Sequence, residues 1–225
     1  MTLYLLQCVC SEMTIPVKPK RGYRSVRRSA QASDTRAAVL SAAHDLFIRE
    51  GWQKATVAAI ARQAGVSVET IYAGFGSKHA LLEAVVVAAV RGLQPGTALM
   101  DQAGPRTVLG APDQRSQITF FAKDIAEVLR RVAPLMAVVR AAAESEPELK
   151  ELYVELHRGR TRNLAMVVDA MLRHGPLRTD RDTAIASLDR LSSPELFLVV
   201  TNIEGLSPAQ YATWLADALT ALLLR

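Results

Sequence analysis

The chain has 225 residues, half of them hydrophobic, which is enough to bury a sizeable core in one or two domains. Aromatic residues make up only 5% while alanine and leucine are abundant, so the composition favours an all-α fold and disfavours sheets. The formal net charge of +5, concentrated near the N-terminus, predicts a nucleic-acid partner. Charged residues or prolines interrupt every apolar run, so we expect no membrane partner.

Residues 1–32 are expected to form a disordered basic arm. Residues 1–30 carry six Lys or Arg against one acid, and residues 14–32 are rich in Pro, Lys, Arg and Ser. Such an arm can lie along phosphates or enter a minor groove of DNA, and we expect Arg27 and Arg28 to make these contacts.

The first residues contain an alternative start and two cysteines. Met13 is as good a start as Met1, in which case residues 1–12 are not translated. Cys8 and Cys10 stand one residue apart, which makes them a poor disulfide pair and, without partner ligands, a poor zinc site. We therefore expect no metal or other cofactor and a reduced, cytoplasmic setting.

Residues 33–78 are expected to form a DNA-binding head that begins with a helix over about residues 35–50. Two short helices then meet at Gly65, which can leave a helix with positive φ at no steric cost. Thr56 and Ser67 can cap these helices by accepting backbone N–H groups. Two helices joined by a tight glycine turn are typical of a helix-turn-helix that reads DNA.

This stretch resembles the DNA-binding domain of the TetR family of bacterial regulators. The residues that carry the resemblance run from the first predicted helix to the start of the helix after the reading helix: Ala42, Ala43, Leu46, Phe47, Gly51, Thr56, Ile60, Ala61, Ala64, Gly65, Val66, Ser67, Thr70, Ile71, Tyr72, Phe75, Ser77, Lys78 and Leu81. The resemblance implies an N-terminal three-helix head and a larger C-terminal helical domain for regulation and dimerisation. The sequence has no nucleophile–base pair, phosphate-binding glycine loop or zinc-like Cys/His set, so we expect no enzymatic activity.

The resemblance also places the contacts to double-stranded DNA. Thr56, Tyr72 and Lys78 fall at phosphate-contacting positions, and a hydroxyl, a phenol and an ammonium all donate to phosphate oxygens. The surface expected to face the bases has few long donors, so we expect modest specificity, supplemented by the basic arm and by DNA shape. Its expected residues are Ser67, Val68, Glu69, Thr70 and Ala73.

Residues 79–225 are expected to form the ligand-binding and dimerisation domain. A helix over about residues 77–92 links it to the head, and residues 92–115 are rich in Gly and Pro and predict a loop. The remaining helices are predicted over about 117–132, 134–144, 147–174, 181–191, 194–202 and 208–224.

The C-terminal helices are expected to pair two copies of the chain. By resemblance they form a four-helix bundle, and the apolar candidates for its surface are Leu196, Leu198, Val199, Trp214, Leu215, Leu219, Leu222 and Leu223, which could equally be core. The body should enclose a pocket for an unidentified small-molecule effector. Polar residues on otherwise apolar helices are its candidate lining, namely Arg140, Tyr153, His157 and Asn163.

These features predict a ligand-responsive transcriptional regulator, most often a repressor in this family, that binds a palindromic operator as a homodimer. The alternative is an effector-independent dimeric DNA-binding protein whose C-terminal domain is purely structural. A filled apolar body without a cavity would favour that alternative.

Overall fold

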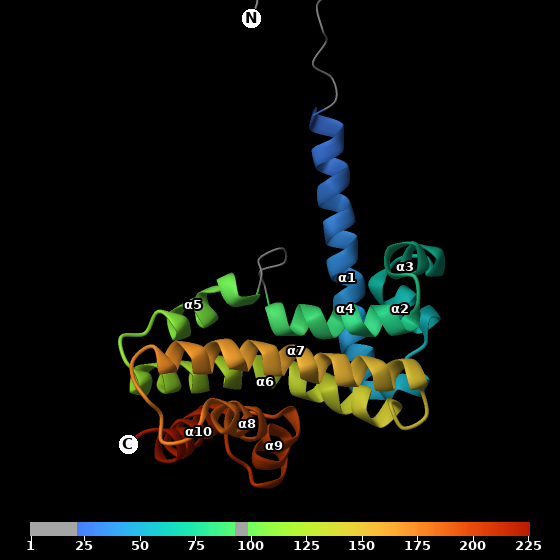
Figure 1. The fold of residues 1–225 in the computed structure, drawn as a ribbon. Helices are drawn as coiled ribbons and strands as arrows, with labels where there is room; N and C mark the ends of the chain where they lie inside the picture. The colour runs from blue at the N-terminus through green and yellow to red at the C-terminus, as the bar shows by residue number, and fades with distance from the viewer. Residues whose placement is uncertain (1–21, 93–98) are drawn as a thin grey trace, which may run out of the picture.

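The computed structural model describes residues 22–92 and 99–225, with side chains from residue 30 onward, and this part of the chain is helical and contains no strand. Figure 1 shows a head of α1, α2 and α3 set at one end of a body whose long helices α4, α6 and α7 run alongside one another. The helices α8, α9 and α10 lie on the other side of α6 and α7 from the head. The predicted all-α fold, with an N-terminal helix-turn-helix and a C-terminal helical domain, is confirmed.

The elements follow one another with short connections. Their bounds are α1 Gly22–Lys54, α2 Val57–Ala64, α3 Val68–Phe75, α4 Lys78–Arg91, the 3-10 turn η1 Leu99–Asp101, α5 Ala103–Leu109, α6 Gln114–Ala142, α7 Pro147–Leu172, α8 Arg181–Leu191, α9 Pro194–Leu198, the π-helical turn η2 Val199–Ile203 and α10 Pro208–Leu223.

The first helix is longer than predicted. It begins at Gly22 and extends away from the rest of the molecule, so residues 22–32, which were expected to be part of a disordered arm, are helical (Figure 1). Residues 22–32 contain no proline, and their arginines, alanine and glutamine are compatible with a helix. The rest of the arm, residues 1–21, lies outside the described residues. At Gly51 the backbone leaves the helical conformation with φ 72° and ψ 179°, so the predicted break at this glycine is present.

The body differs from the prediction in two places. The break predicted at Pro134 is wrong, because α6 runs unbroken through it. A buried stripe that includes Leu129, Leu135 and Val139 continues on both sides of the proline and stabilises one continuous helix despite the lost backbone N–H. The predicted loop over residues 92–115 contains α5, whose Pro105 sits in the first turn, where a missing N–H costs no helical hydrogen bond.

The last helices match their predictions closely. α8 has the predicted bounds, and α10 begins after Ser207, whose hydroxyl accepts the N–H of Gln210 while the Gln210 side chain accepts the N–H of Ser207. Tyr211 is fully buried behind this cap and donates a hydrogen bond to the carbonyl of Leu191 at 2.8 Å.

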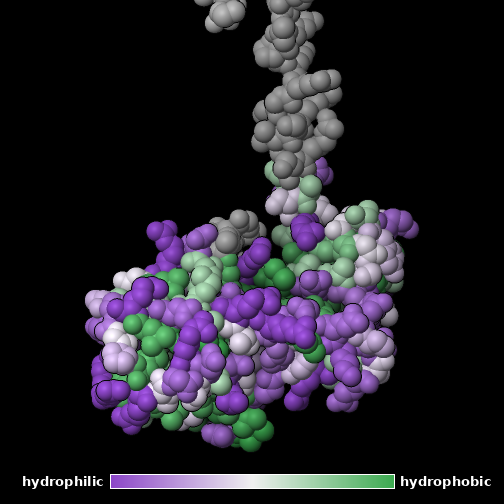
Figure 2. All heavy atoms as spheres, viewed as in Figure 1, coloured by the Kyte–Doolittle hydropathy of each residue, from purple (hydrophilic) through white to green (hydrophobic). Residues whose placement is uncertain are grey.

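Hydrophilic side chains cover most of the face seen in Figure 2, and an apolar cluster lies at its lower edge, over the segment between α9 and α10. Ile203 in that segment is 78% exposed. In the described part of the chain no single helix is long and apolar enough to cross a membrane; only α3 and α4 taken together pass by length and composition, and they are bent by 70°.

Candidate nucleic-acid interface and effector cavity

Side-chain caps set the boundaries of the helix-turn-helix. The hydroxyl of Thr56 accepts the N–H of Ala59 at 3.1 Å, and the hydroxyl of Ser67 accepts the N–H of Thr70 at 3.2 Å. Gly65 ends α2 in the left-handed conformation with φ 67°, where a side chain would be strained. The predicted caps and turn of this motif are therefore present.

The exposed face of α3 carries most of the residues predicted to face the bases. Ser67, Glu69, Thr70 and Ala73 are exposed, whereas Val68 is half-buried and packs on the core. Hydrogen bonds from its own backbone N–H and from Ser67 lower the pKa of Glu69, so it presents a carboxylate at neutral pH. This face can accept hydrogen bonds from base edges through Glu69 and exchange them through the two hydroxyls.

Two of the predicted phosphate contacts are open to solvent. Tyr72 is 49% exposed and Thr56 is exposed beside the N-terminus of α2. Ile71 between these surfaces is buried, which fixes α3 on the head. Both Thr56 and Tyr72 are therefore available to a phosphate backbone, as their predicted roles require.

Lys78 has a structural contact that the sequence did not predict. Its ammonium donates to the carbonyl oxygen of Trp52 and lies 4.1 Å from the centroid of the Trp52 ring. Burial lowers the pKa of Lys78. Lys78 thus holds the start of α4 against the end of α1, and its contact with phosphate stays a prediction.

Arg36 is a head residue that the sequence did not single out. Its guanidinium donates to the carbonyl of Gly74 at 3.3 Å and lies 4.3 Å from the centroid of the Phe75 ring. It therefore ties α1 to the last turn of α3 across 38 positions of sequence, a separation at which no local pattern indicates contact. Arg27 and Arg28 lie in the outer part of α1, where side chains are not described.

The head is joined to the corner between α6 and α7. The indole N–H of Trp52 donates to the Glu146 carboxylate at 3.3 Å, and the amide of Gln53 donates to the same oxygen at 3.4 Å. Two residues further along the chain, the Glu148 carboxylate lies 3.0 Å from the Nδ1 of His79. Two carboxylates of the body thus contact three residues of the head and its linking helix.

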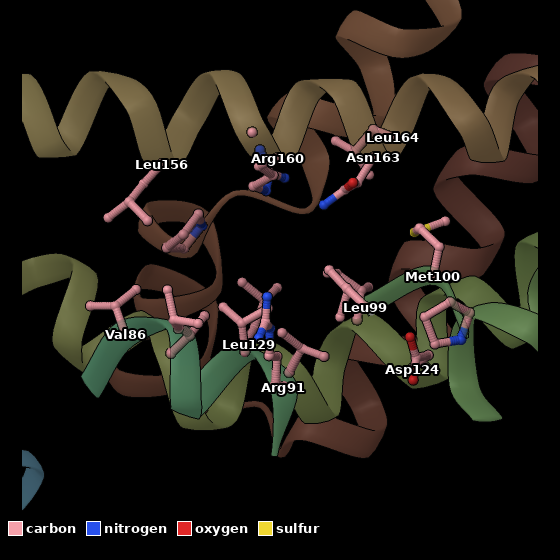
Figure 3. A pocket seen from close by; sticks show the side chains of 18 of the residues that line it. Val86, Arg91, Leu99, Met100, Asp124, Leu129, Leu156, Arg160, Asn163 and Leu164 are labelled. Atoms are coloured by element: carbon pink, nitrogen blue, oxygen red, sulfur yellow. The ribbon is translucent and has the colours of Figure 1, made fainter. Parts of the chain in front are cut away.

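The body encloses a cavity of about 370 Å³ between α4, α5, α6 and α7. Its wall is mostly apolar, with Val86, Leu129 and Leu156 among the residues in Figure 3. This volume falls at the lower end of the range of roughly 300–1,000 Å³ that is usual for small-molecule pockets.

The predicted effector residues divide among three places. His157 and Asn163 line the cavity, as predicted. Tyr153 instead lines a shallower groove between α7 and α8 and donates to the Glu195 carboxylate at 2.9 Å. The prediction for Arg140 is wrong, because it is exposed near the C-terminal end of α6 and lines neither space.

Four charged residues of the cavity wall were missed by the sequence prediction: Arg91, Asp124, Glu155 and Arg160. Arg160 projects from α7 and donates from Nη2 to the carbonyl of Asp189 at 2.8 Å and to the hydroxyl of Ser192 at 2.9 Å. It also forms an ion pair with the Asp189 carboxylate. Arg160 therefore joins the cavity wall to α8, and its charge is already balanced.

Asp124 brings a carboxylate to the α5 side of the cavity, as Figure 3 shows. Burial raises its pKa, and the nearby charge of Arg131 only partly offsets this effect. An ideal Cβ at Gly104 would lie 1.9 Å from Oδ1 of Asp124, so this approach of α5 to the carboxylate requires glycine. The sequence indicated neither contact, because 20 positions separate the two residues.

The apolar residues predicted for dimerisation also divide. Leu215, Leu219 and Leu223 are fully buried inside the chain, so their assignment to a partner-facing surface is wrong. They lie on the inner face of α10, the helix that packs most extensively against α6. The exposed or half-buried members of the predicted set are Leu196, Leu198, Val199, Trp214 and Leu222.

Comparison with known proteins places the head in a family. A sequence model described as bacterial regulatory proteins, tetR family, matches residues 39–85. No protein of curated function matches the chain.

Solved structures match over almost the whole fold. NalD, the secondary repressor of the MexAB-OprM multidrug efflux pump in Pseudomonas aeruginosa, is 20% identical with a TM-score of 0.66, and the match covers 87% of this chain and 98% of that one. A transcriptional regulator from Saccharomonospora viridis in complex with choline is 20% identical with a TM-score of 0.65, covering 86% and 99%. A TetR-family regulator from Mesorhizobium loti is 19% identical with a TM-score of 0.66, covering 87% and 99%.

Proposed function

We propose that the chain is a TetR-family transcriptional regulator that represses transcription as a homodimer on a palindromic operator, from which a small-molecule effector releases it. The exposed face of α3 carries this proposal, because it presents hydroxyls and a carboxylate to solvent while Ile71 anchors the helix to the head. Regulators of this family bind DNA and are not enzymes, and we expect this one to act in the cytoplasm.

The DNA contacts that we propose fall into two groups. Thr56, Tyr72 and Lys78 hold the phosphate backbone, together with Arg27 and Arg28 of the first helix. The residues proposed to face the base edges are Ser67, Val68, Glu69, Thr70 and Ala73. Because this second group lacks long donors, phosphate contacts and DNA shape supply a large share of the affinity.

Two copies of the head are needed to read a palindrome, since one short helix spans only part of an operator. We propose residues 33–78 as the reading head and residues 79–225 as the body that pairs. The exposed Val199, Trp214 and Leu222 support a pairing surface on the C-terminal helices.

The cavity supports an effector-responsive protein over one with a purely structural body. It is lined by α4, which starts at the head, and by α7, which starts at the corner that holds the head. A ligand bound there contacts both elements, and it shifts the spacing of the two heads if it prefers one arrangement of them.

Footprinting of the full chain on the DNA that flanks its own gene tests this proposal. Protection of a palindrome should persist when salt is raised, because base contacts do not depend on counterion release as phosphate contacts do. Binding that is uniform along the DNA and lost steeply with salt would contradict specific reading.

Tyr72 provides a matched pair of variants. Tyr72→Phe keeps the ring and removes the hydroxyl, and we expect it to weaken operator binding about tenfold, as for one hydrogen bond to a charged group. Tyr72→Ala should weaken binding at least as much while leaving the melting temperature nearly unchanged, since the side chain is half exposed. Unchanged operator affinity in both variants would remove Tyr72 from the interface.

A further inference from the structure

The polar groups on the wall of the cavity indicate the chemistry of its ligand, an inference that deepens the proposed function and rests on it. Most of the lining is aliphatic, and the rings of Phe121 and His157 are the aromatic members. An apolar body therefore fills most of the space, and the few polar groups decide which head group it carries.

Among the charged groups that line the cavity, Asp124 has the fewest partners that offset its charge. It lies on α6 within the cavity lining, and its carboxylate forms no hydrogen bond with any described residue. The nearest cation, Arg131, uses its Nε to donate to the carbonyl of Ala89 at 2.9 Å. An ionised carboxylate can only accept hydrogen bonds, so a donor or a cation from outside the protein would satisfy it.

The cations of the wall are less suited to hold an anionic ligand. Arg160 is neutralised by Asp189 and also donates to Ser192. Arg91 is exposed to solvent at the end of α4, where water screens its charge. The Nε of Arg160 is buried without a hydrogen-bond partner among the described residues, but the charge of this arginine is already paired with Asp189. Neither arginine therefore presents a water-shielded charge that lacks a carboxylate partner.

Asn163 supplies a second acceptor. Its amide projects from α7 into the cavity in Figure 3 and forms no hydrogen bond with a described residue. The amide oxygen can accept a hydrogen bond from the ligand, and so can the Asp124 carboxylate across the cavity. Two acceptors on an apolar wall match a head group that carries several donors.

We propose that the effector is an apolar molecule with a protonated amine, whose ammonium binds Asp124 and Asn163 while its apolar part lies among the aliphatic side chains of α4, α6 and α7. At roughly 30 Å³ per non-hydrogen atom, the value for water in the liquid, a cavity of about 370 Å³ holds a ligand of about a dozen such atoms. The proposed class is thus small alkyl or cycloalkyl amines.

Calorimetric titration of the full chain with three probes of equal chain length tests the head group: octylammonium, octan-1-ol and octanoate. Octylammonium should bind about ten- to hundredfold more tightly than the other two, as expected for a hydrogen bond to a charged group. Tighter binding of octanoate, or equal binding of all three, would overturn the assignment.

Three variants locate the contact. Asp124→Asn keeps the shape of the side chain and removes its charge, so it should abolish most of the preference for octylammonium. Gly104→Ala keeps the charge but forces the carboxylate aside, and should weaken the same probe. Glu127→Gln is the matched control, because Glu127 lies three residues after Asp124 on α6, is exposed, pairs with Arg130 and does not line the cavity, and it should bind octylammonium as the parent chain does. Retention of the preference in Asp124→Asn, in a variant that still melts cooperatively at or above the melting temperature of the parent, would overturn the proposal.

The same protein should also be footprinted on its operator with and without octylammonium. DNA protection without binding of any probe would overturn the proposed ligand class but would still support the proposed function. Binding of octylammonium without any specific DNA protection would support the amine site and contradict the proposed function.

Discussion

The head and the body of this molecule are specified by different kinds of interaction. In the head, two helices of eight residues each are delimited by hydroxyl caps and by a glycine with positive φ. In the body, α6 and α7 extend over 29 and 26 residues, so local signals mark their first turns while a long buried stripe stabilises the rest of each helix. Short elements depend on their ends, whereas long elements depend on what they pack against.

The largest effect is expected when an aromatic ring is removed from the core of the head. Phe47 is fully buried and stacks on Trp52 with ring centroids 5.9 Å apart. Phe47→Ala should lower the free energy of unfolding by about 3–5 kcal/mol, because it leaves a cavity in a small core. Urea denaturation followed by Trp52 fluorescence measures the loss, and a change below about 1 kcal/mol would mean that the head does not depend on this core.

Restoring a backbone donor in α6 tests the body. Pro134 lies inside a continuous helix, where proline removes one hydrogen bond and crowds the preceding turn. Pro134→Ala should raise the free energy of unfolding by about 1–3 kcal/mol, seen as a higher melting temperature. A lower melting temperature would show instead that the packing of α6 requires the geometry that proline imposes.

The next test compares one cap in each region. Ser67→Ala and Ser207→Ala each remove a hydroxyl that accepts a backbone N–H, and each should cost about 1 kcal/mol of helix stability. In Ser67→Ala the eight-residue α3 should lose amide protection in hydrogen exchange. In Ser207→Ala the loss should stay within the first turn of α10, because that helix is anchored by Tyr211 and Leu215. If amide protection were lost along the whole of α10 in Ser207→Ala, as along α3 in Ser67→Ala, the two regions would not differ in their dependence on caps.

The smallest expected effect concerns the carboxylate in the cavity. Burial raises the folded-state pKa of Asp124, so the folded protein binds its proton more tightly than the unfolded chain does. Stability from this group therefore falls as pH rises through the interval between its two pKa values, and the loss is complete above the folded value. Asp124→Asn lacks this loss and should melt about 2 °C higher at neutral pH.

The gain from Asp124→Asn should shrink as pH is lowered and vanish below about 3, where the carboxyl group is neutral in both states. Thermal melts of the parent chain and the variant across this range measure the difference. A gain that grows at low pH would contradict the assignment. The same substitution removes the proposed ammonium contact, so we expect the variant to be more stable and to bind octylammonium less tightly.

The contrast also explains what could be predicted from the sequence. Thr56, Gly65 and Ser67 act on neighbours within a few positions, so the boundaries of α2 and α3 were predictable from local chemistry. The contacts of Asp124 and Arg36 join residues 20 and 38 positions apart, and no local pattern indicates them. For this reason a cavity in the body could be expected from the resemblance, but its lining could not. Arg140 and Tyr153, two of the residues predicted to line it, lie outside it.

Burial within one chain accounts for the remaining error. A stripe of leucines on α10 looks the same in sequence whether it faces α6 or a second copy of the protein. The structure assigns Leu215, Leu219 and Leu223 to the first and leaves Trp214 and Leu222 exposed. Periodicity identifies an apolar face, but only the packing of distant helices determines what covers it.

Because α7 runs from the cavity to the corner between α6 and α7, a small rotation of this helix at the cavity displaces the corner. Arg160 lies 13 positions from Pro147, a distance of about 20 Å along the helix at 1.5 Å per residue. A tilt of about 5° at the cavity would therefore displace this corner by nearly 2 Å, by the same rise per residue. The contact of 3.0 Å between His79 and Glu148 cannot persist across such a displacement unless the head moves with the corner. Under the proposed function, a small rearrangement around a bound effector would therefore displace the DNA-binding head by a comparable distance.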